Sequence, residues 1–215
     1  MPPRLTIVSP CYNEEATLPH SADALSAFLE RMISLGKVTP ESRILFVNDG
    51  SQDQTWPIIK ELHRTCPYVD GLSLAGNVGS ELAIMAGMMQ AREYSDAVVT
   101  IDSDLQDDLD AVEEMLDRLA EGYDIVYGVK VSRTADPFLK RTTAQAFYRL
   151  QQAMGIRMIY NHTNFRLMSR RALDALALYP ERNLYLRGII PQLGFPATTV
   201  DDVIREREAG TSKYN

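Results

Sequence analysis

The stretch AVVTIDSD, residues 97–104, is an apolar, β-rich run that ends in two carboxylates one residue apart. The run predicts a buried strand. Alternate residues of a strand point to the same face, so Asp102 and Asp104 would reach one ion together. Such oxygen donors suit Mg²⁺ or Mn²⁺, and Gln106 and Asp107 follow closely enough to add ligands. The alternative is a plain strand end with acidic turn residues.

The residues around this stretch alternate between strand and helix patterns over the first 130 positions. Short β-rich runs and segments with apolar residues at helical spacing follow one another. Alternating units of this kind give a mostly parallel sheet with helices on both faces, the α/β fold class. The expected strands are residues 5–8, 44–47, 71–75, 97–102 and 124–128, and the expected helices are residues 16–35, 53–63, 79–94 and 109–121.

Polar clusters follow three of the expected strands at the point where each strand ends. The segment CYNE (residues 11–14) follows the first strand, Asp49 follows the second, and Asp102 ends the strand described above. Ligands of parallel sheets bind outside the carboxyl ends of the strands, so the three clusters should converge on one edge. The first strand is not followed by Gly-x-Gly-x-x-Gly, and there is no Gly-Lys-Ser/Thr loop, which argues against dinucleotide-binding and phosphate-loop proteins.

The pattern changes after residue 130. Residues 131–137 are typical of a loop, and residues 138–155 predict a basic amphipathic helix. Such a helix can lie on a membrane surface, but more often it packs on the core. The remaining expected elements are a strand at 165–168, a helix at 170–178, a mixed apolar segment at 184–193 that could serve a subunit contact, and a strand at 198–205.

The net charge of −7 on this 215-residue chain is unevenly distributed. Residues 1–129 carry 8 Lys and Arg against 22 Asp and Glu, whereas residues 130–215 carry 14 against 7. An acidic half that holds a metal and a basic half that faces phosphates or anionic lipid would have this distribution, although chance drift of surface charge also produces it.

The sequence predicts neither a disulfide framework nor a membrane span. Cys11 and Cys66 lie far apart without metal-ligand spacing, which is typical of reduced thiols in a cytosolic protein. Residues 1–4 run straight into the first strand, so no signal peptide is expected. No stretch approaches about 18 consecutive apolar residues, the length that a spanning helix needs.

Four motifs give the chain a family resemblance. They are VSPCYNEE (8–15), VNDGSQDQT (47–55), DSDLQD (102–107) and REAGTSKY (207–214). The chain resembles family 2 glycosyltransferases of the GT-A fold, and most closely the polyprenyl-phosphate sugar transferases of the dolichyl-phosphate mannosyltransferase and bactoprenol glucosyltransferase types. The first three motifs mark the fold and the use of a nucleotide sugar. The fourth, with NFRL (164–167), points to the lipid-phosphate subgroup.

This resemblance implies an enzyme. Residues 1–130 would form the nucleotide-sugar-binding half and residues 131–215 the acceptor-binding half of one GT-A domain. The implied reaction is an inverting, metal-dependent transfer of a hexose from a nucleotide diphosphate sugar, with a UDP-sugar favoured, to a polyprenyl phosphate at the cytoplasmic face of the membrane. The alternatives are a polysaccharide acceptor, or a nucleotide-sugar-binding protein with impaired catalysis. No nucleic acid partner is expected, and a homo-oligomer stays open.

The resemblance also implies roles for individual residues. A buried carboxylate at Asp49 is suited to accept the N3–H of uracil, although Asp-Gly also favours a plain turn. The metal, Mg²⁺ or Mn²⁺, would act as a Lewis acid on the leaving diphosphate. The expected catalytic residues are Asp102, Asp104, Asn164 and Arg207; the metal ligands are Asp102, Asp104 and Gln106; and the residues that bind the nucleotide sugar are Pro10, Tyr12, Asn13, Glu14, Asp49, Ser51, Asn77, Gly79, Asp102, Ser103, Lys130, Arg141 and Lys213.

Some of these assignments have simpler alternatives. The cations Lys130, Arg141, Arg207 and Lys213 are candidates to hold phosphates, but each alone is as easily a solvated surface charge. The amides of residues 77–80, which open a helix, could meet an anion. A simple N-cap by the side chain of Asn77 or Ser80 is equally consistent with the sequence.

The chain departs from the family pattern at three places. Many relatives place Asp where this chain has Asn164, and an amide cannot accept a proton. A phosphate acceptor is already ionised near pH 7, so the change should affect orientation more than chemistry. Relatives often carry Arg where Gly76 stands, and they usually continue into hydrophobic membrane segments where this sequence stops at Asn215. A missing membrane anchor is therefore expected.

Overall fold

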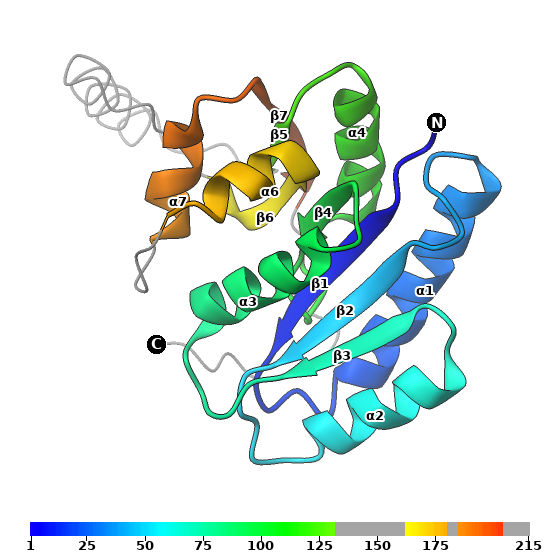
Figure 1. Cartoon of the computed structure of the whole chain (residues 1–215). Coiled ribbons are helices and arrows are strands. Elements are labelled where there is room, and N and C mark those ends of the chain that lie inside the picture. Colours follow the sequence, from blue (N-terminus) through cyan, green and yellow to red (C-terminus); the bar gives the residue numbers. More distant parts are fainter. Residues whose placement is uncertain (132–161, 180–184, 204–215) are drawn as a thin grey trace.

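The computed structural model describes residues 1–131, 162–179 and 185–203, which form one mixed sheet with helices on both faces (Figure 1). The strand order is β3-β2-β1-β4-β6-β5-β7. The strands are β1 (Leu5–Cys11), β2 (Arg43–Asn48), β3 (Val69–Ser73), β4 (Ala97–Thr100), β5 (Ile125–Val131), β6 (His162–Ser169) and β7 (Ala197–Val203). The helices are α1 (Leu18–Ser34), α2 (Thr55–Thr65), α3 (Ser80–Arg92), α4 (Leu109–Ala120), α6 (Arg170–Leu176) and α7 (Leu186–Ile189), followed by a 3₁₀ turn, η1 (Ile190–Leu193).

Most of the strand pairs in this sheet are parallel. Strand β1 pairs with β2 and with β4 in parallel, and β2 pairs with β3 in the same sense. Strand β6 runs antiparallel between β4 and β5, and β7 pairs with β5 in parallel. The predicted α/β class with a mostly parallel sheet is confirmed. The proposed division of the chain at residue 130 stays a prediction.

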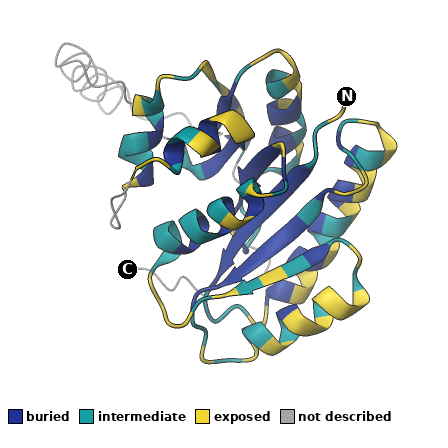
Figure 2. Ribbon diagram, viewed as in Figure 1, coloured by how far each residue is buried: buried dark blue, intermediate teal, exposed yellow. Residues whose placement is uncertain are grey.

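Alternation along the strands divides the core into two layers. Ile44 and Phe46 of β2 pack with α1, α2 and α4, whereas Leu45 and Val47 pack with α3, α6 and α7. Successive residues of a strand face opposite sides, so each central strand contributes to both layers. Figure 2 accordingly shows the central strands as buried along most of their length, with exposed residues on the outer sides of the helices.

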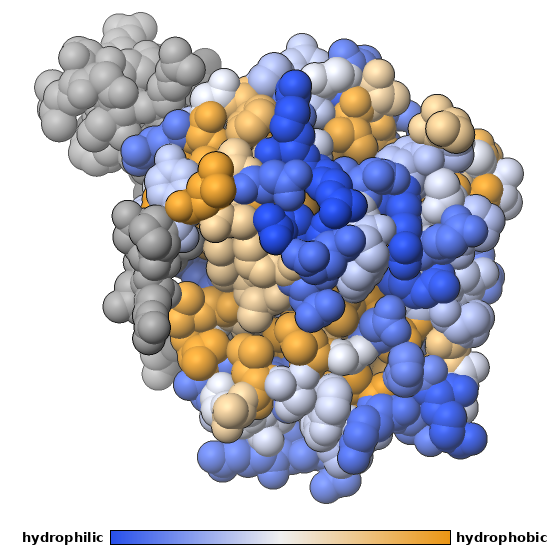
Figure 3. Space-filling view, viewed as in Figure 1, coloured by the Kyte–Doolittle hydropathy of each residue, from blue (hydrophilic) through white to orange (hydrophobic). Residues whose placement is uncertain are grey.

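Helix α3 lies unusually close to the sheet because of one glycine. A Cβ at Gly87 would lie 2.5 Å from Cγ1 of Val8 and 2.8 Å from Cγ2 of Val47. The contact packs α3 directly against β1 and β2. Leu82 and Met85 of α3 are half-buried, and Figure 3 shows apolar side chains gathered over this part of the molecule.

The structure corrects the placement of the two acidic residues. Strand β4 ends at Thr100, so Asp102 and Asp104 belong to the turn that follows rather than to the strand. The argument that strand alternation aligns them was therefore wrong. The predicted strand at 71–75 begins two residues earlier, with Val69. The expected loop at 131–137 starts one residue too early, because Val131 still belongs to β5. Residues 132–137 and the basic helix expected at 138–155 lie outside the described residues.

No helix within the described ranges is both long and apolar enough to cross a membrane.

The close approach of α3 makes Gly87 a test of the packing. We expect Gly87→Ala to lower the free energy of unfolding by about 1–3 kcal/mol, because the added methyl group would overpack the contact with Val8 and Val47. Helix propensity alone would change stability in the opposite direction. Urea unfolding followed by circular dichroism measures the effect, with the exposed Gln90→Ala as a control expected to be nearly neutral. A Gly87→Ala protein at least as stable as the wild type would contradict the packing argument.

Candidate active site

A hollow of about 200 Å³ opens at the carboxyl ends of the central strands. It lies where the chain reverses its direction across the sheet, because β2 lies on one side of β1 and β4 on the other. Open α/β sheets bind ligands at such a switch point. The structure thus brings together residues from the loops after β1, β2 and β4 with the starts of α3 and β6. The lining residues are Pro10, Cys11, Tyr12, Glu14, Asp49, Ser80, Asp102, Ser103, Asp104 and Asn164.

The loops after β1 and β2 are hydrogen-bonded to each other. The backbone N–H of Asn13 donates to Oγ of Ser51 at 3.0 Å, and the N–H of Gln52 donates to Oδ1 of Asn13 at 2.8 Å. The N–H of Glu14 donates to Oγ1 of Thr55 at 2.8 Å. Asn13 has a φ of +54°, a left-handed conformation that asparagine tolerates well. Asn13 and Ser51 therefore hold the rim of the hollow, and their contact with a nucleotide stays a prediction.

The carboxylate of Asp49 binds the loop that precedes α3. This side chain is 1% exposed, and it accepts hydrogen bonds from the N–H groups of Val78 at 2.7 Å and Gly79 at 2.9 Å. The amides before α3, which were predicted to meet an anion, therefore bind the carboxylate of Asp49, a side chain of the protein itself. The alternative of an N-cap by the side chain of Asn77 or Ser80 is excluded, because Gly79 occupies the cap position and no side chain caps the helix.

A glycine brings the loops after β2 and β3 into direct contact. Gly50 has a φ of +66°, and a Cβ there would lie 2.5 Å from the backbone N of Asn77. Any side chain at this position would push the two loops apart. Asn77 itself is exposed and does not line the hollow, and neither does Gly79.

The two acidic residues after β4 lie on a tight turn. Asp102 is exposed, whereas Ser103 is buried and its carbonyl accepts a hydrogen bond from the hydroxyl of Ser21. Oδ1 of Asp104 accepts from the N–H of Gln106 at 3.3 Å, and Leu105 between them has a φ of +49°. The turn, rather than strand alternation, directs Asp102 and Asp104 to the same hollow. Gln106 belongs to the turn but not to the lining.

A buried acidic pair lies beneath this turn. Burial raises the pKa of Asp107 to about 7, with further contributions from the charges of Asp102 and Asp202. Nζ of Lys130 lies 3.6 Å from Oδ1 of Asp107, and Lys130 is paired with Asp202 in the sheet register. Lys130 therefore contacts an acid beside the hollow without lining it. Sequence reasoning missed Asp202, because nothing in the run at 198–205 distinguishes it from a surface residue.

Asn164 reaches the hollow from the start of β6. Its Oδ1 accepts a hydrogen bond from Nη2 of Arg166 at 3.1 Å. Cys11 also lines the hollow, but burial raises the pKa of its thiol far above the usual range, so it is not a reactive thiolate at neutral pH. The predicted site residues Arg141, Arg207 and Lys213 lie outside the described residues.

The donor set suits a cation that is shared with a phosphorylated ligand. In the described part of the chain no three His, Cys, Asp or Glu side chains converge as a complete metal site. Mg²⁺ and similar cations commonly use one or two carboxylates plus phosphate oxygens and water. Asp102 and Asp104, which line the same hollow, can supply these two carboxylates.

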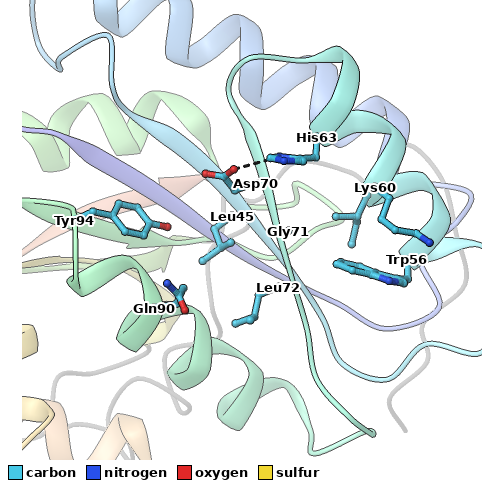
Figure 4. Close-up of a pocket in the computed structure, with 10 residues that line it drawn as sticks. Leu45, Trp56, Lys60, His63, Asp70, Gly71, Leu72, Gln90 and Tyr94 are labelled. Atoms are coloured by element: carbon cyan, nitrogen blue, oxygen red, sulfur yellow. Dashed lines mark ion pairs between the residues drawn. The ribbon is translucent and has the colours of Figure 1, made fainter.

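A second, larger cavity of about 420 Å³ lies at the side of the sheet, along the edge strand β3 (Figure 4). It contains none of the predicted site residues. In Figure 4 the strand passes between Trp56 of α2 and Tyr94, which follows α3, and the ion pair of His63 with Asp70 lies nearby. This cavity lies away from the switch point between β1 and β4, so the smaller hollow remains the candidate active site.

Substitution of Asp49 tests whether its hydrogen bonds hold the loop before α3 in place. We expect Asp49→Ala to lower the free energy of unfolding by about 2–3 kcal/mol, because two backbone donors lose a charged acceptor. Hydrogen exchange followed by NMR should show lost protection at the amides of Val78 and Gly79. Asp49→Asn, which keeps one acceptor oxygen, should lose less. Unchanged exchange at both amides would show that the carboxylate does not hold this loop.

Comparison with known sequences places the chain among proteins of one family. Residues 6–177 match Glycosyl transferase family 2. The uncharacterized glycosyltransferase YkoT of Bacillus subtilis (strain 168) is 46% identical over 212 residues, which cover 99% of this chain and 63% of that protein. The bactoprenol glucosyl transferase of Shigella phage SfV is 36% identical over 214 residues, which cover 99% of this chain and 67% of that protein. The chain therefore spans 63% and 67% of the lengths of these two relatives.

Solved structures share the fold at low sequence identity. The mannosyltransferase PcManGT from Pyrobaculum calidifontis, in complex with GDP-Man and Mn²⁺, has a TM-score of 0.61 and 17% identity, covering 97% of this chain and 59% of that one. The glucosyl-3-phosphoglycerate synthase from Mycobacterium tuberculosis, in complex with Mn²⁺, UDP and glucosyl-3-phosphoglycerate, has a TM-score of 0.62 and 18% identity, covering 97% and 73%. The fold is thus the GT-A fold, and with the match over residues 6–177 the chain belongs to glycosyltransferase family 2.

Proposed function

We propose that this chain catalyses the transfer of a hexose from a nucleotide diphosphate sugar to a polyprenyl phosphate, with inversion and with the help of a divalent cation. The observation that carries the proposal is the hollow at the switch point, which Asp102 and Asp104 line together with Tyr12 and Asp49. Relatives described as bactoprenol glucosyl transferases support a lipid phosphate as the acceptor. The reaction would then take place at the cytoplasmic face of the membrane.

The nucleoside of the donor, which we infer to be a UDP-sugar, would lie between the loops after β1 and β2. Pro10 and Tyr12 would flank the base, with Glu14 near the ribose. Asp49 already accepts two amide hydrogen bonds. Each carboxylate oxygen has a second lone pair, so Asp49 can also accept the N3–H of uracil without releasing the loop.

Asp102 and Asp104 would hold Mg²⁺ or Mn²⁺ beside the diphosphate, with Gln106 as a further ligand from the same turn. The cation, when bound, would neutralise the departing nucleotide as a Lewis acid. The residues of the chain would orient the sugar so that its anomeric carbon faces the acceptor. Holding the two reactants in line supplies much of the rate acceleration in such a transfer.

The acceptor needs little help from a base. A phosphate monoester is already ionised near pH 7, so its oxygen can attack the anomeric carbon without first losing a proton. Attack from the side opposite the leaving diphosphate inverts the configuration. Asn164, which lines the hollow, can therefore serve the reaction although an amide cannot accept a proton. Arg141, Arg207 and Lys213 remain proposed phosphate ligands.

The cation site is tested by removal of one carboxylate. We expect Asp104→Ala to weaken Mn²⁺-dependent binding of UDP at least about tenfold, since a charged ligand of the bridging cation is lost. Isothermal titration calorimetry with UDP, with and without Mn²⁺, measures this change. The exposed Asp23→Ala, which removes the same charge elsewhere, should bind UDP as the wild type does. An unaltered Mn²⁺-dependent affinity in Asp104→Ala would refute the site assignment.

The acceptor class is tested by the solubility of the product. A thermal-shift screen of nucleotide sugars first identifies the best donor, because a ligand of the native state raises the apparent stability. With that donor radiolabelled and undecaprenyl phosphate added, we expect label to enter the organic phase in a Mn²⁺-dependent manner. Label that enters only a water-soluble polymer would support a polysaccharide acceptor instead. Donor binding without transfer to either acceptor would favour the impaired, nucleotide-sugar-binding alternative that Asn164 suggests.

A further inference from the structure

Arg166 is a buried cation directly behind the hollow. It lies in β6, where the sheet register pairs it with Thr100 of β4 and Tyr127 of β5. The residue is 2% exposed, and although burial lowers the pKa of its guanidinium to about 10, the group stays charged at neutral pH. Burying a guanidinium costs several kcal/mol unless its donors are bound. The groups that bind the buried guanidinium of Arg166 therefore indicate the role of this residue.

All the hydrogen bonds that the guanidinium of Arg166 makes in the described chain go to one short segment at the start of β6. Nη2 donates to the carbonyl of Thr163 at 3.0 Å and to Oδ1 of Asn164 at 3.1 Å, and Nε donates to the carbonyl of Asn164 at 3.4 Å. Nη1 is buried without an acceptor among the described residues. The hydroxyl of Thr100 also donates to the carbonyl of Asn164. Asn164 is thus held through its backbone and its side chain.

This arrangement determines which end of the Asn164 amide is offered to the hollow. A guanidinium carries only donors, so the atom of Asn164 that contacts Nη2 must be the carbonyl oxygen and not the nitrogen. The other end of the planar amide, Nδ2, accordingly points away from Arg166. Asn164 lines the hollow together with Asp102 and Asp104. Within the described residues no group accepts a hydrogen bond from Nδ2.

We propose that Arg166 is a positioning residue that fixes Asn164 so that Nδ2–H donates to an oxygen of the acceptor phosphate. The inference rests on the proposed function, because it assumes that an anionic acceptor enters this hollow. The bond from Nη2 to Oδ1 polarises the amide and strengthens Nδ2–H as a donor. An aspartate at position 164, which many relatives carry, would present a carboxylate oxygen and could not donate this hydrogen bond. The chain is therefore built at this position to hold an anion rather than to remove a proton.

Steady-state kinetics with farnesyl phosphate as acceptor, the preferred donor and Mn²⁺ tests the proposal. We expect Asn164→Asp to raise the KM for farnesyl phosphate about tenfold or more, which is the size expected for loss of a hydrogen bond to a charged group. Mn²⁺-dependent UDP affinity should stay unchanged. A kcat that rises in Asn164→Asp would overturn the proposal, because it would mean that the wild-type site lacks a base. A KM that stays the same or falls would overturn it as well, because the amide would then not contribute to binding of the acceptor.

Arg166 is tested by two substitutions and a matched control. We expect Arg166→Met to raise the same KM as Asn164→Asp does, because Asn164 is no longer held, and Arg166→Lys to restore part of the loss. The control Arg171→Met removes an exposed arginine at the start of α6, which pairs with Asp124, and should leave the KM unchanged. If Arg166→Met does not fold, as judged by circular dichroism, Arg166→Lys and the Asn164 variants decide the question. A wild-type KM in Arg166→Lys and in Asn164→Ala would overturn it.

An NMR measurement separates this inference from the proposed reaction. The side-chain amide signal of Asn164, identified by its loss in Asn164→Asp, should shift downfield when farnesyl phosphate is added to the ¹⁵N-labelled protein. The shift should be smaller in Arg166→Lys. A shift without any lipid product would refute the proposed transfer but support the orientation of Asn164. Lipid product without a shift would overturn the role of Asn164 and Arg166 while leaving the reaction intact.

Discussion

The parallel pairing of β1 with strands on both of its sides is the constraint on which the site depends. Because β2 and β4 flank β1, the chain leaves the carboxyl end of the sheet in two opposite directions. The loops diverge there, and a hollow remains that none of the described helices fills. Tyr12 and Asp102 lie at the start of these diverging segments, so both face the same space. Residues about 90 positions apart in the sequence are joined in one site by strand order alone.

The diverging loops are joined by part-buried hydrogen bonds. Asp49 binds the segment before α3, while Asn13 and Ser51 bind the loops after β1 and β2 to one another. The left-handed φ values of Asn13 and Leu105 occur beside these contacts. Leucine seldom adopts that conformation, so the surrounding structure must enforce it at the turn with the two acids. The rim of the hollow is therefore preorganised rather than shaped by a ligand.

The sequence predicts the local features well and the long-range ones poorly. Apolar periodicity identified the strands and helices of the first 130 residues, and the rule for strand ends brought residues 11–14, Asp49 and Asp102 to one edge. The predictions that failed concern contacts between residues that are far apart in the sequence. The position of β6 between β4 and β5, the acid Asp202 beneath the turn and the amides that Asp49 binds are set by register and packing. The end of β4 at Thr100 could not be predicted, since the turn after it is held by Ser21 of α1.

The charges around the hollow explain why a neutral amide suits position 164. Asp102 and Asp104 line the hollow, and buried Asp107 lies behind them with its pKa raised to about 7 by burial and by neighbouring acids. In the proposed reaction, the same crowding of negative charge that would attract a divalent cation would oppose the approach of an anionic acceptor. A further carboxylate would add to this repulsion, and the buried charge of Arg166 would only partly offset it. An amide anchored by that same guanidinium adds a donor without adding a negative charge, so the proposed site could bind an anion at Asn164 while Asp102 and Asp104 hold the cation.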